Sequence, residues 1–306
     1  MINCGLIGVG KFGKNILKNL KKHEAIKDIY LCDTNLQAIS QFQNLPISNN
    51  YKLLLKNNDI QSIFIATPSN FHYNMVMDSI NAGKHVFCEK PLCSTNNELL
   101  RIYENNKKCN KIIFCDYTFC HSNMITQIKN IIQLYNFYNH CNINISWKNT
   151  NFDTLQTETY IDVVRDLGVH CLSVLMFLFD SNDITITHVD KKYDNLIIIE
   201  ATIYAKILNN NCIINISWDN SNKERSIQFF NDKQHLEVDF FKEKIILTNK
   251  QVNQVNQVNI IEKEEPLFNS ISCFINSIQQ DKNNFNLTHT ILNKRIMYTV
   301  KKILDY

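Results

Sequence analysis

Glycine is rare in this chain and is concentrated at its start. Only six glycines occur among 306 residues, and four of them lie within the first 13 positions. A short apolar run, Ile2 to Ile7, leads into the motif Gly8-x-Gly10-x-x-Gly13, and in residues 14–22 apolar side chains recur at helical spacing. This order predicts a β-strand, a tight turn and a helix.

In a strand-turn-helix unit, each glycine of this motif has its own mechanical role. Gly8 makes the turn, Gly10 lets a pyrophosphate approach the backbone, and Gly13 lets the helix pack close to the strand. The N-terminus of the helix then offers unpaired N–H groups and a positive dipole end to phosphates. The segment, including Lys11 and Phe12, therefore predicts a dinucleotide-binding loop. A glycine-rich turn without a ligand is the structural alternative.

An acidic residue at the expected distance supports a dinucleotide and indicates which one. A second apolar strand, Ile29 to Cys32, ends in Asp33, which lies twenty residues after Gly13. In this fingerprint such a residue binds the hydroxyls of the adenosine ribose. Its carboxylate repels a 2′-phosphate, and no arginine follows in Thr34-Asn35. NAD is therefore favoured over NADP.

The alternation of strands and helices continues through the first 120 residues. Strands are expected at 62–66, 85–88 and 112–115, and helices at 73–82 and 95–107. This pattern predicts an α/β domain with a doubly wound parallel sheet, the Rossmann fold, over residues 1–120. Ligands of such sheets lie at the carboxyl ends of the strands. Besides the glycine loop and Asp33, the expected cofactor contacts are Thr67, Ser69, His72 and Glu89.

Four segments together resemble one protein family. They are Gly8 to Gly13, Ala66-Thr67-Pro68 with His72, residues 82–92 (AGKHVFCEKPL), and residues 166–170 (DLGVH). They are similar to the family of glucose-fructose oxidoreductase, inositol 2-dehydrogenase and MocA-type proteins. The resemblance implies a Rossmann domain followed by an α/β domain with a large, mostly antiparallel sheet. It also implies that Lys90 lies between nicotinamide and substrate and that Asp166 and His170 complete the site.

The three predicted catalytic residues also make chemical sense by themselves. The ammonium of Lys90 can hydrogen-bond the oxygen of a substrate alcohol as hydride leaves its carbon. Asp166 and His170 are four residues apart, which places them on one face of a helix. An imidazole suits proton transfer near neutral pH. A structural histidine at a helix start is the alternative for His170.

Two further histidines and a lysine have weaker cases. A polar cap on the following helix is the alternative for His72. Lys84 and His85 are expected to be a solvent-exposed residue and an edge-strand residue, outside the site.

The chain departs from the family pattern at two places. Ser173 stands where many members have a carboxylate, and Tyr117-Thr118-Phe119 stands where many have an asparagine and an arginine. Both changes resemble a branch that acts on amino sugars or nucleotide-linked sugars. In that branch a D-H-T-F-like segment occurs, similar to Asp116-Tyr117-Thr118-Phe119. Tyr117 and Thr118 are therefore expected beside the substrate.

The pattern changes after residue 120, so residues 121–306 are assigned to a substrate-binding and oligomerisation domain. Its alternating segments predict strands near residues 143–147 and 214–218, and at 184–188, 196–207, 226–230, 235–241 and 244–248. One helix, Val163 to Phe179, is expected to back this antiparallel sheet. An uncovered face would serve a homodimer or homotetramer, as in the family. The repeat Gln251 to Asn259 is interpreted as a loop insertion or irregular strand without function.

Composition excludes several classes of function. A net charge of +3 without basic clusters predicts no nucleic-acid partner. The longest apolar stretches fall far short of the roughly 20 residues of a membrane span, and no basic segment precedes the apolar start as in a signal peptide. The eleven cysteines are scattered without a C-x-x-C pair, so we expect no metal site and buried thiols in the reducing cytoplasm.

These observations favour an NAD-dependent oxidoreductase of a sugar or nucleotide sugar, such as a UDP-sugar 3-dehydrogenase in surface-glycan biosynthesis. A non-catalytic NAD-binding sensor of the same fold is the main alternative. Enzymes like dihydrodipicolinate reductase or homoserine dehydrogenase share the glycine motif but not Glu89-Lys90-Pro91.

Overall fold

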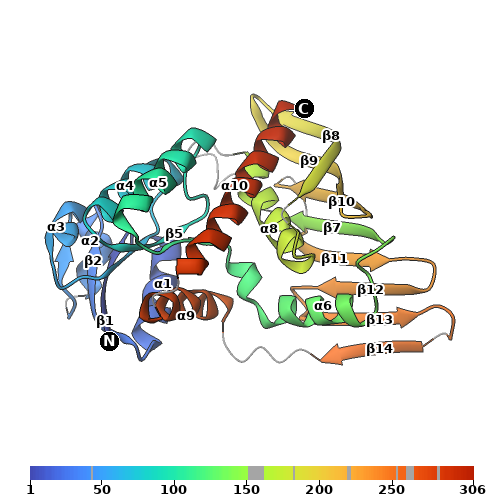
Figure 1. The fold of residues 1–306 in the computed structure, drawn as a ribbon, viewed down its shortest axis with the longest axis horizontal. Coiled ribbons are helices and arrows are strands. Elements are labelled where there is room, and N and C mark those ends of the chain that lie inside the picture. Colours follow the sequence, from blue (N-terminus) through green and yellow to red (C-terminus); the bar gives the residue numbers. More distant parts are fainter. Residues whose placement is uncertain are drawn as a thin grey trace. The chain divides into compact units, whose positions relative to one another are not determined.

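Two compact units make up the protein (Figure 1). The computed structural model describes residues 1–42, 44–150, 162–181, 183–218, 222–252, 254–259, 265–280 and 283–306. The first unit comprises Met1–Thr118 and Glu264–Lys294, and the second comprises Phe119–Lys263 and Arg295–Tyr306. The division of the chain at residue 120 remains a prediction about domains, but the contacts group Glu264–Lys294 with the N-terminal unit.

The first unit contains a six-stranded parallel sheet in the order β3-β2-β1-β4-β5-β6. Its strands are β1 (Ile2–Ile7), β2 (Ile26–Cys32), β3 (Ile47–Ser48), β4 (Ser62–Ile65), β5 (His85–Glu89) and β6 (Ile113–Asp116). The predicted doubly wound sheet is confirmed. The strand order reverses between β1 and β4, and in such sheets ligands bind at the carboxyl edge beside that point.

Helices cover this sheet on both faces, as the alternating pattern predicts. They are α1 (Lys11–Lys22), α2 (Leu36–Ile39), α3 (Tyr51–Lys56), α4 (His72–Asn81), α5 (Asn96–Cys109) and α9 (Pro266–Gln279). Helices α4 and α5 pack together, as do α1 and α9 (Figure 1). Each of the larger helices has an apolar face that the sheet or a neighbouring helix buries.

An aromatic cluster explains why α9 belongs to the first unit. Phe64, Phe87 and Phe114 lie side by side on neighbouring strands, with ring centroids 5.0 and 5.1 Å apart. Phe274 of α9 meets all three edge-on at 5.4 to 5.8 Å. All four rings are fully buried. Edge-to-face contacts of this kind add to the free energy of apolar burial, so residues far along the chain complete the N-terminal core.

The second unit contains an eight-stranded sheet in the order β14-β13-β12-β11-β7-β10-β9-β8. Its strands are β7 (Asn142–Lys148), β8 (Ile184–Asp194), β9 (Ile197–Ile207), β10 (Asn210–Ser217), β11 (Glu224–Phe230), β12 (Gln234–Asp239), β13 (Lys244–Asn249) and β14 (Gln254–Asn259). Every neighbouring pair is antiparallel except β7 and β10. The predicted large, mostly antiparallel sheet is confirmed.

The expectation of a single helix in the second half was wrong. The predicted helix begins as a π-helical turn, Val164–Gly168, and continues as α8 (Val169–Leu178). Besides α9, the structure adds α6 (Asn123–Leu134) and α10 (Asn283–Asp305). Apolar residues recur at helical spacing in α6, where Ile125, Ile128 and Ile132 are fully buried. Among the described helices, none is long and apolar enough to cross a membrane.

Part of the Gln251–Asn259 repeat, from Gln254 to Asn259, forms the regular strand β14. This corrects the interpretation of the repeat as a loop insertion or irregular strand. Strand β14 pairs antiparallel with β13 in continuous register, from Lys244 opposite Asn259 to Asn249 opposite Gln254. It is the last strand of the sheet, and Val255 is 63% exposed. An edge strand with exposed side chains needs only backbone pairing, so alternation of polar and apolar residues is not required.

The cysteines are predominantly internal. All eleven are free thiols, and nine are buried; Cys109 and Cys273 are half-buried. Burial raises the pKa of the Cys93 thiol to about 12. The buried cysteines therefore pack as small apolar groups. In the described part of the chain, no three His, Cys, Asp or Glu residues are grouped so as to hold a metal ion.

Candidate active site

The three glycines of the N-terminal motif meet three different steric demands. Gly8 has a φ of +87°, and a Cβ on it would lie 2.6 Å from the carbonyl oxygen of Ala66. A Cβ on Gly13 would lie 2.0 Å from the carbonyl oxygen of Gly8. A Cβ on Gly10 would meet no atom within 4 Å. Gly8 and Gly13 are therefore required by the fold, whereas Gly10 keeps open the space that a pyrophosphate would occupy.

Asp33 is fixed beside this loop at the end of β2. Its Oδ2 accepts the backbone N–H of Val9 at 2.7 Å, and its Oδ1 accepts that of Asn35 at 2.9 Å. Each carboxylate oxygen retains a lone pair, so the group can still accept ribose hydroxyls. Lys11 and Phe12 are exposed in the first turn of α1. The arrangement fits an adenine dinucleotide.

Lys90 directly follows β5 at the same carboxyl edge of the sheet as the glycine loop. It is half-buried, and its peptide bond to Pro91 is cis. Because all six strands are parallel, the ends of β1, β2 and β5 lie on one edge. The structure thus brings Lys90 to the edge where Gly8 and Asp33 also lie.

Next to Lys90, two carboxyl groups face each other across β5 and β6. Glu89 and Asp116 are register partners in the parallel pair. Asp116 is fully buried and accepts hydrogen bonds from the hydroxyls of Ser270 at 2.6 Å and Thr118 at 2.7 Å. Burial first, and then the charge of Asp116, raises the pKa of Glu89 well above its ordinary value, although the charge of Lys90 opposes this. The raised pKa favours the protonated form of Glu89, which can donate a hydrogen bond to Asp116.

The second oxygen of this acid is unsatisfied. Glu89 Oε1 is buried without a hydrogen-bond partner among the described residues. Such an acceptor is costly unless a ligand supplies a donor, and a carboxamide N–H₂ at the nicotinamide end of the cofactor would satisfy it. Glu89 was predicted as a cofactor contact, whereas Asp116 was named only as part of the segment Asp116-Tyr117-Thr118-Phe119 and not as a partner of Glu89.

His72 ties together two loops of this edge and does not offer its ring nitrogens to a ligand. Its Nδ1 lies 2.7 Å from the carbonyl oxygen of Pro91, and its Nε2 lies 2.8 Å from that of Thr67. The side chain is 1% exposed, and burial lowers its pKa. Backbone carbonyls engage both ring nitrogens, and a cofactor contact of His72 stays a prediction. The alternative of a helix cap fails, because α4 begins at His72 without a side-chain cap.

Thr67 and Ser69 lie in the loop that His72 holds. The hydroxyl of Thr67 lies 3.6 Å from the sulfur of Met75, and Ser69 is a half-buried residue that begins the short 3₁₀ turn Ser69–Phe71. Both follow β4, so they remain predicted cofactor contacts.

Tyr117 and Thr118 direct their hydroxyls into the first unit. Tyr117 is 4% exposed and donates to Oδ1 of Asn293 at 2.7 Å, while Asn293 donates to the hydroxyl of Tyr103 at 2.7 Å. The hydroxyl of Thr118 donates to Asp116. Internal partners hold both hydroxyls, and the position of Tyr117 and Thr118 beside the substrate stays a prediction. Asn293 is remote in the sequence, so this network had no local signal.

Lys84 and His85 also differ from their expected surroundings. Lys84 is buried, and its Nζ donates to the carbonyl oxygens of Asn57 and Ile60, both at 2.7 Å. Nδ1 of His85 accepts the backbone N–H of Ile112 at 3.0 Å. Strand β5 lies between β4 and β6, so neither residue belongs to an exposed edge.

In the second unit, Asp166 and His170 lie at the start of the α8 segment. Asp166 belongs to the π-helical turn, and its Oδ2 accepts the indole N–H of Trp218 at 3.0 Å. The ring of His170 meets Phe119 edge-on at 5.0 Å and stacks over Trp147 at 6.2 Å. π-turns inside helices are frequent at functional sites. The hydroxyl of Ser173 donates to the carbonyl oxygen of His170 at 2.9 Å.

Sequence analysis missed Arg225, which shares the aromatic surroundings of His170. Its guanidinium carbon lies 5.0 Å from the Phe119 ring centroid and 5.5 Å from that of Trp147. Burial lowers the pKa of Arg225, whereas the charge of Asp166 raises it.

The comparisons with known proteins agree with this geometry. Residues 2–117 match the model of an oxidoreductase family with an NAD-binding Rossmann fold. This part of the chain belongs to the Gfo/Idh/MocA family. The resemblance found in the sequence, to glucose-fructose oxidoreductase, inositol 2-dehydrogenase and MocA-type proteins, is thereby confirmed.

Curated relatives match part of the chain. An inositol 2-dehydrogenase of Salmonella paratyphi B is 26% identical over 138 residues, which cover 43% of this chain and 41% of the relative. The uncharacterized oxidoreductase YrbE of Bacillus subtilis is 32% identical over 101 residues, 32% of this chain and 30% of the relative. The matched segments thus span roughly a third of the relatives they match.

Solved structures extend the likeness in fold to the whole chain. KijD10, a 3-ketoreductase from Actinomadura kijaniata in complex with NADP and TDP-benzene, has a TM-score of 0.88 at 13% identity, covering 99% of this chain and 97% of its own. The UDP-N-acetylglucosamine 3-dehydrogenase GnnA from Acidithiobacillus ferrooxidans has a TM-score of 0.81 at 15% identity, covering 99% and 96%. At these identities the likeness shows the two-domain Gfo/Idh/MocA fold alone.

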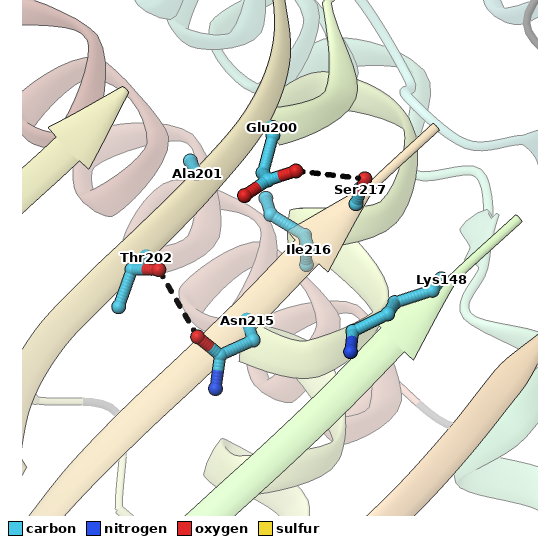
Figure 2. Close-up of a pocket in the computed structure, with 7 residues that line it drawn as sticks. All are labelled: Lys148, Glu200, Ala201, Thr202, Asn215, Ile216 and Ser217. Carbon is cyan, nitrogen blue, oxygen red and sulfur yellow. Dashed lines mark hydrogen bonds between the residues drawn. The ribbon is translucent and has the colours of Figure 1, made fainter. Parts of the chain in front are cut away.

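A small cavity on the second unit lies away from His170. Figure 2 shows Lys148, Glu200, Thr202, Asn215 and Ser217 around it, with hydrogen bonds from Ser217 to Glu200 and from Thr202 to Asn215. Its volume is about 120 Å³, below the roughly 300 Å³ of the smallest ligand pockets. These side chains alternate with the buried ones of the same strands, such as Trp147, and so point to the opposite sheet face. The cavity is therefore not the candidate active site.

Proposed function

We propose that this chain is an NAD-dependent oxidoreductase that transfers hydride between nicotinamide and a hydroxyl-bearing carbon of a sugar or nucleotide sugar. Oxidation of a UDP-sugar at its 3-hydroxyl, in surface-glycan biosynthesis, is one such reaction. The observation that carries the proposal is the position of Lys90 on the sheet edge that also carries Gly8 and Asp33. The named activities of KijD10 and GnnA support a nucleotide-sugar substrate.

NAD is the proposed cofactor because Asp33 carries a negative charge at the end of β2. That charge would meet a 2′-phosphate, and its hydrogen bond to Val9 holds it in place. NADP is bound in KijD10. The proposed preference for NAD over NADP therefore rests on Asp33 of this chain and not on the shared fold. When bound, the oxidised nicotinamide supplies the hydride acceptor.

Lys90 and His170 are the proposed catalytic residues. Lys90 binds the oxygen of the reacting hydroxyl, and His170 takes its proton as the hydride leaves the same carbon, so that the alcohol becomes a ketone. In the reverse direction His170 returns the proton. Asp166, which Trp218 holds through a hydrogen bond, orients the substrate or the imidazole.

Steady-state kinetics of Lys90→Ala and His170→Ala test these roles. Positioning and general-base contributions are typically on the order of 10² to 10⁴ each, so each variant should lose most of its turnover. NAD affinity, which depends on Gly8 to Gly13 and Asp33, should change little. Because both residues act on one oxygen, the loss in the double variant should be far smaller than the product of the single losses.

The substrates for this test are UDP-sugars and free polyols, screened by the absorbance of reduced cofactor. Wild-type turnover by His170→Ala from mildly acidic to mildly basic pH would reduce His170 to a structural histidine. NAD binding without turnover of any of these sugars by the unaltered protein would favour the sensor alternative.

A further inference from the structure

Arg225 is held within a cluster of aromatic rings in the second unit. It lies on β11 opposite Trp147 of β7 in the antiparallel register. Its guanidinium carbon lies 5.0, 5.5 and 5.3 Å from the ring centroids of Phe119, Trp147 and Phe241. A cation over three ring faces is attracted by each of them.

One N–H donor of this cation has no acceptor in the part of the chain that the structure describes. Arg225 Nε is buried and has no hydrogen-bond partner there, and no described carboxylate forms a salt bridge with Arg225. Ring faces attract the charge but accept no hydrogen bond in the plane of the guanidinium, so the N–H at Nε stays without an acceptor among the described residues. A buried charged donor without an acceptor is costly. An incoming anion would supply the missing acceptors.

The cation is close to the residue proposed to move the proton. Arg225 and His170 each lie 5.0 Å from the ring centroid of Phe119, and both pack on Trp147. The guanidinium and the imidazole therefore border one aromatic surface. An anionic group bound at Arg225 and a hydroxyl bound at His170 would therefore both lie beside the Phe119 ring.

We propose that Arg225 binds an anionic oxygen group of the sugar substrate, namely the phosphate on its anomeric carbon or a carboxylate on its ring. The inference rests on the proposed function, since it takes the substrate to be a sugar. Guanidinium presents parallel N–H donors that match two oxygens of a phosphate or carboxylate. Arg225 thus makes a charged sugar the preferred substrate over a neutral one.

Tryptophan fluorescence provides a readout that does not depend on turnover. The chain has only two tryptophans, Trp147 and Trp218. Trp147 packs against Arg225 and Trp218 hydrogen-bonds Asp166. Ligands at this site should therefore change the emission. The probes are UDP-N-acetylglucosamine for the phosphate, glucuronate for the carboxylate, and methyl glucoside as the neutral sugar.

Arg225→Met should weaken binding of the preferred anionic probe by about 10- to 100-fold, the usual loss for a charged hydrogen bond. Binding of methyl glucoside and NAD should not change. Arg225→Lys keeps the charge but not the planar fork, so an intermediate loss is expected. Arg101→Met, which removes an exposed cation from the first unit, is the control and should bind all probes like the unaltered protein.

The outcomes separate this inference from the proposed function. Loss of anion binding in Arg225→Met supports it even if Lys90→Ala retains turnover, which would contradict the proposed mechanism alone. Equal binding by Arg225→Met and the unaltered protein would overturn it, as would equal loss of neutral and anionic sugars. Failure of the unaltered protein to bind either anionic probe would also overturn it. If Arg225→Met does not fold, Arg225→Lys decides.

Discussion

Asp33 is held by the glycine loop itself, because its Oδ2 accepts the N–H of Val9. We therefore expect NAD(H) to bind at least about tenfold more tightly than NADP(H), a difference of about 1.4 kcal/mol. Asp33→Asn retains an acceptor for Val9 and removes the charge, so it should narrow this preference without a loss of folding. Calorimetric titration of both cofactors measures it. Equal affinities in the unaltered protein would contradict the role of Asp33.

The raised pKa of Glu89 beside Asp116 makes stability depend on pH. Because the pKa of Glu89 is raised above its ordinary 4.5 in the folded chain, the unfolded chain loses the carboxyl proton first. The stability that the protonated form contributes is fully present below pH 4.5 and falls as pH rises through the folded-state pKa, by up to roughly 1.4 kcal/mol per pH unit. Glu89→Gln keeps a donor for Asp116 and has no proton to lose.

We expect Glu89→Gln to be at least as stable as the unaltered protein at neutral pH and to show a flatter dependence of stability on pH. Urea denaturation from pH 4.5 to 8.5 measures both. Asp116→Asn is the contrasting variant, because it weakens the acceptor of Ser270 and Thr118 and should be destabilised throughout. Identical pH slopes for Glu89→Gln and the unaltered protein would mean that Glu89 is ionised.

At the scale of elements, two glycines of the β1-α1 unit have different tasks: Gly13 is needed for folding and Gly10 for cofactor binding. Gly10→Ala adds a methyl group to open space, whereas Gly13→Ala places one 2.0 Å from the Gly8 carbonyl oxygen. The free energy of unfolding of Gly10→Ala should lie within about 1 kcal/mol of that of the unaltered protein, but this variant should bind NAD at least tenfold more weakly. Gly13→Ala should be destabilised by about 1–3 kcal/mol. Thermal unfolding with and without NAD distinguishes the two, and equal effects would contradict the assignment.

Elements whose signals are local could be predicted, and those that depend on distant partners could not. The glycine motif and Asp33 lie in one βαβ segment, so sequence spacing sufficed for the sheet and its binding edge. Strand β14 needs only the backbone of β13, and a three-residue repeat gives no hint of that. Arg225 depends on the register between β11 and β7. Periodicity indicates the buried face but not which cross-strand neighbour a residue meets.

At the scale of the whole molecule, the large sheet of the second unit has two different faces. One face carries Trp147, Ile203 and Ile214, which are fully buried. The other is mixed, with Ile213 half-buried between its register partners Tyr204 and Asn144. We propose that this face is the contact of a homodimer or homotetramer, as the sequence analysis predicts.

Light scattering at micromolar concentration should give two or four times the chain mass of 35.8 kDa. Ile213→Asp places a charge at the centre of the face and should yield single chains that retain their circular dichroism. Arg101→Asp, at an exposed position of α5 in the first unit, is the control and should not change the mass. A single-chain mass for the unaltered protein would contradict the proposed contact.

The sequence of the edge strand β14 does not specify a single pairing register with β13. Residues 251–259 read QVNQVNQVN, so sliding this strand by three residues along β13 sets an identical triplet against it. A slide by an odd number also exchanges the two sides of the strand, but the exposed Val255 gives little reason to prefer either. Alignment here is therefore set by the length of the connection from β13 and not by side-chain matching. Adding or removing one triplet should lengthen or shorten this border of the sheet while leaving the rest of the fold intact.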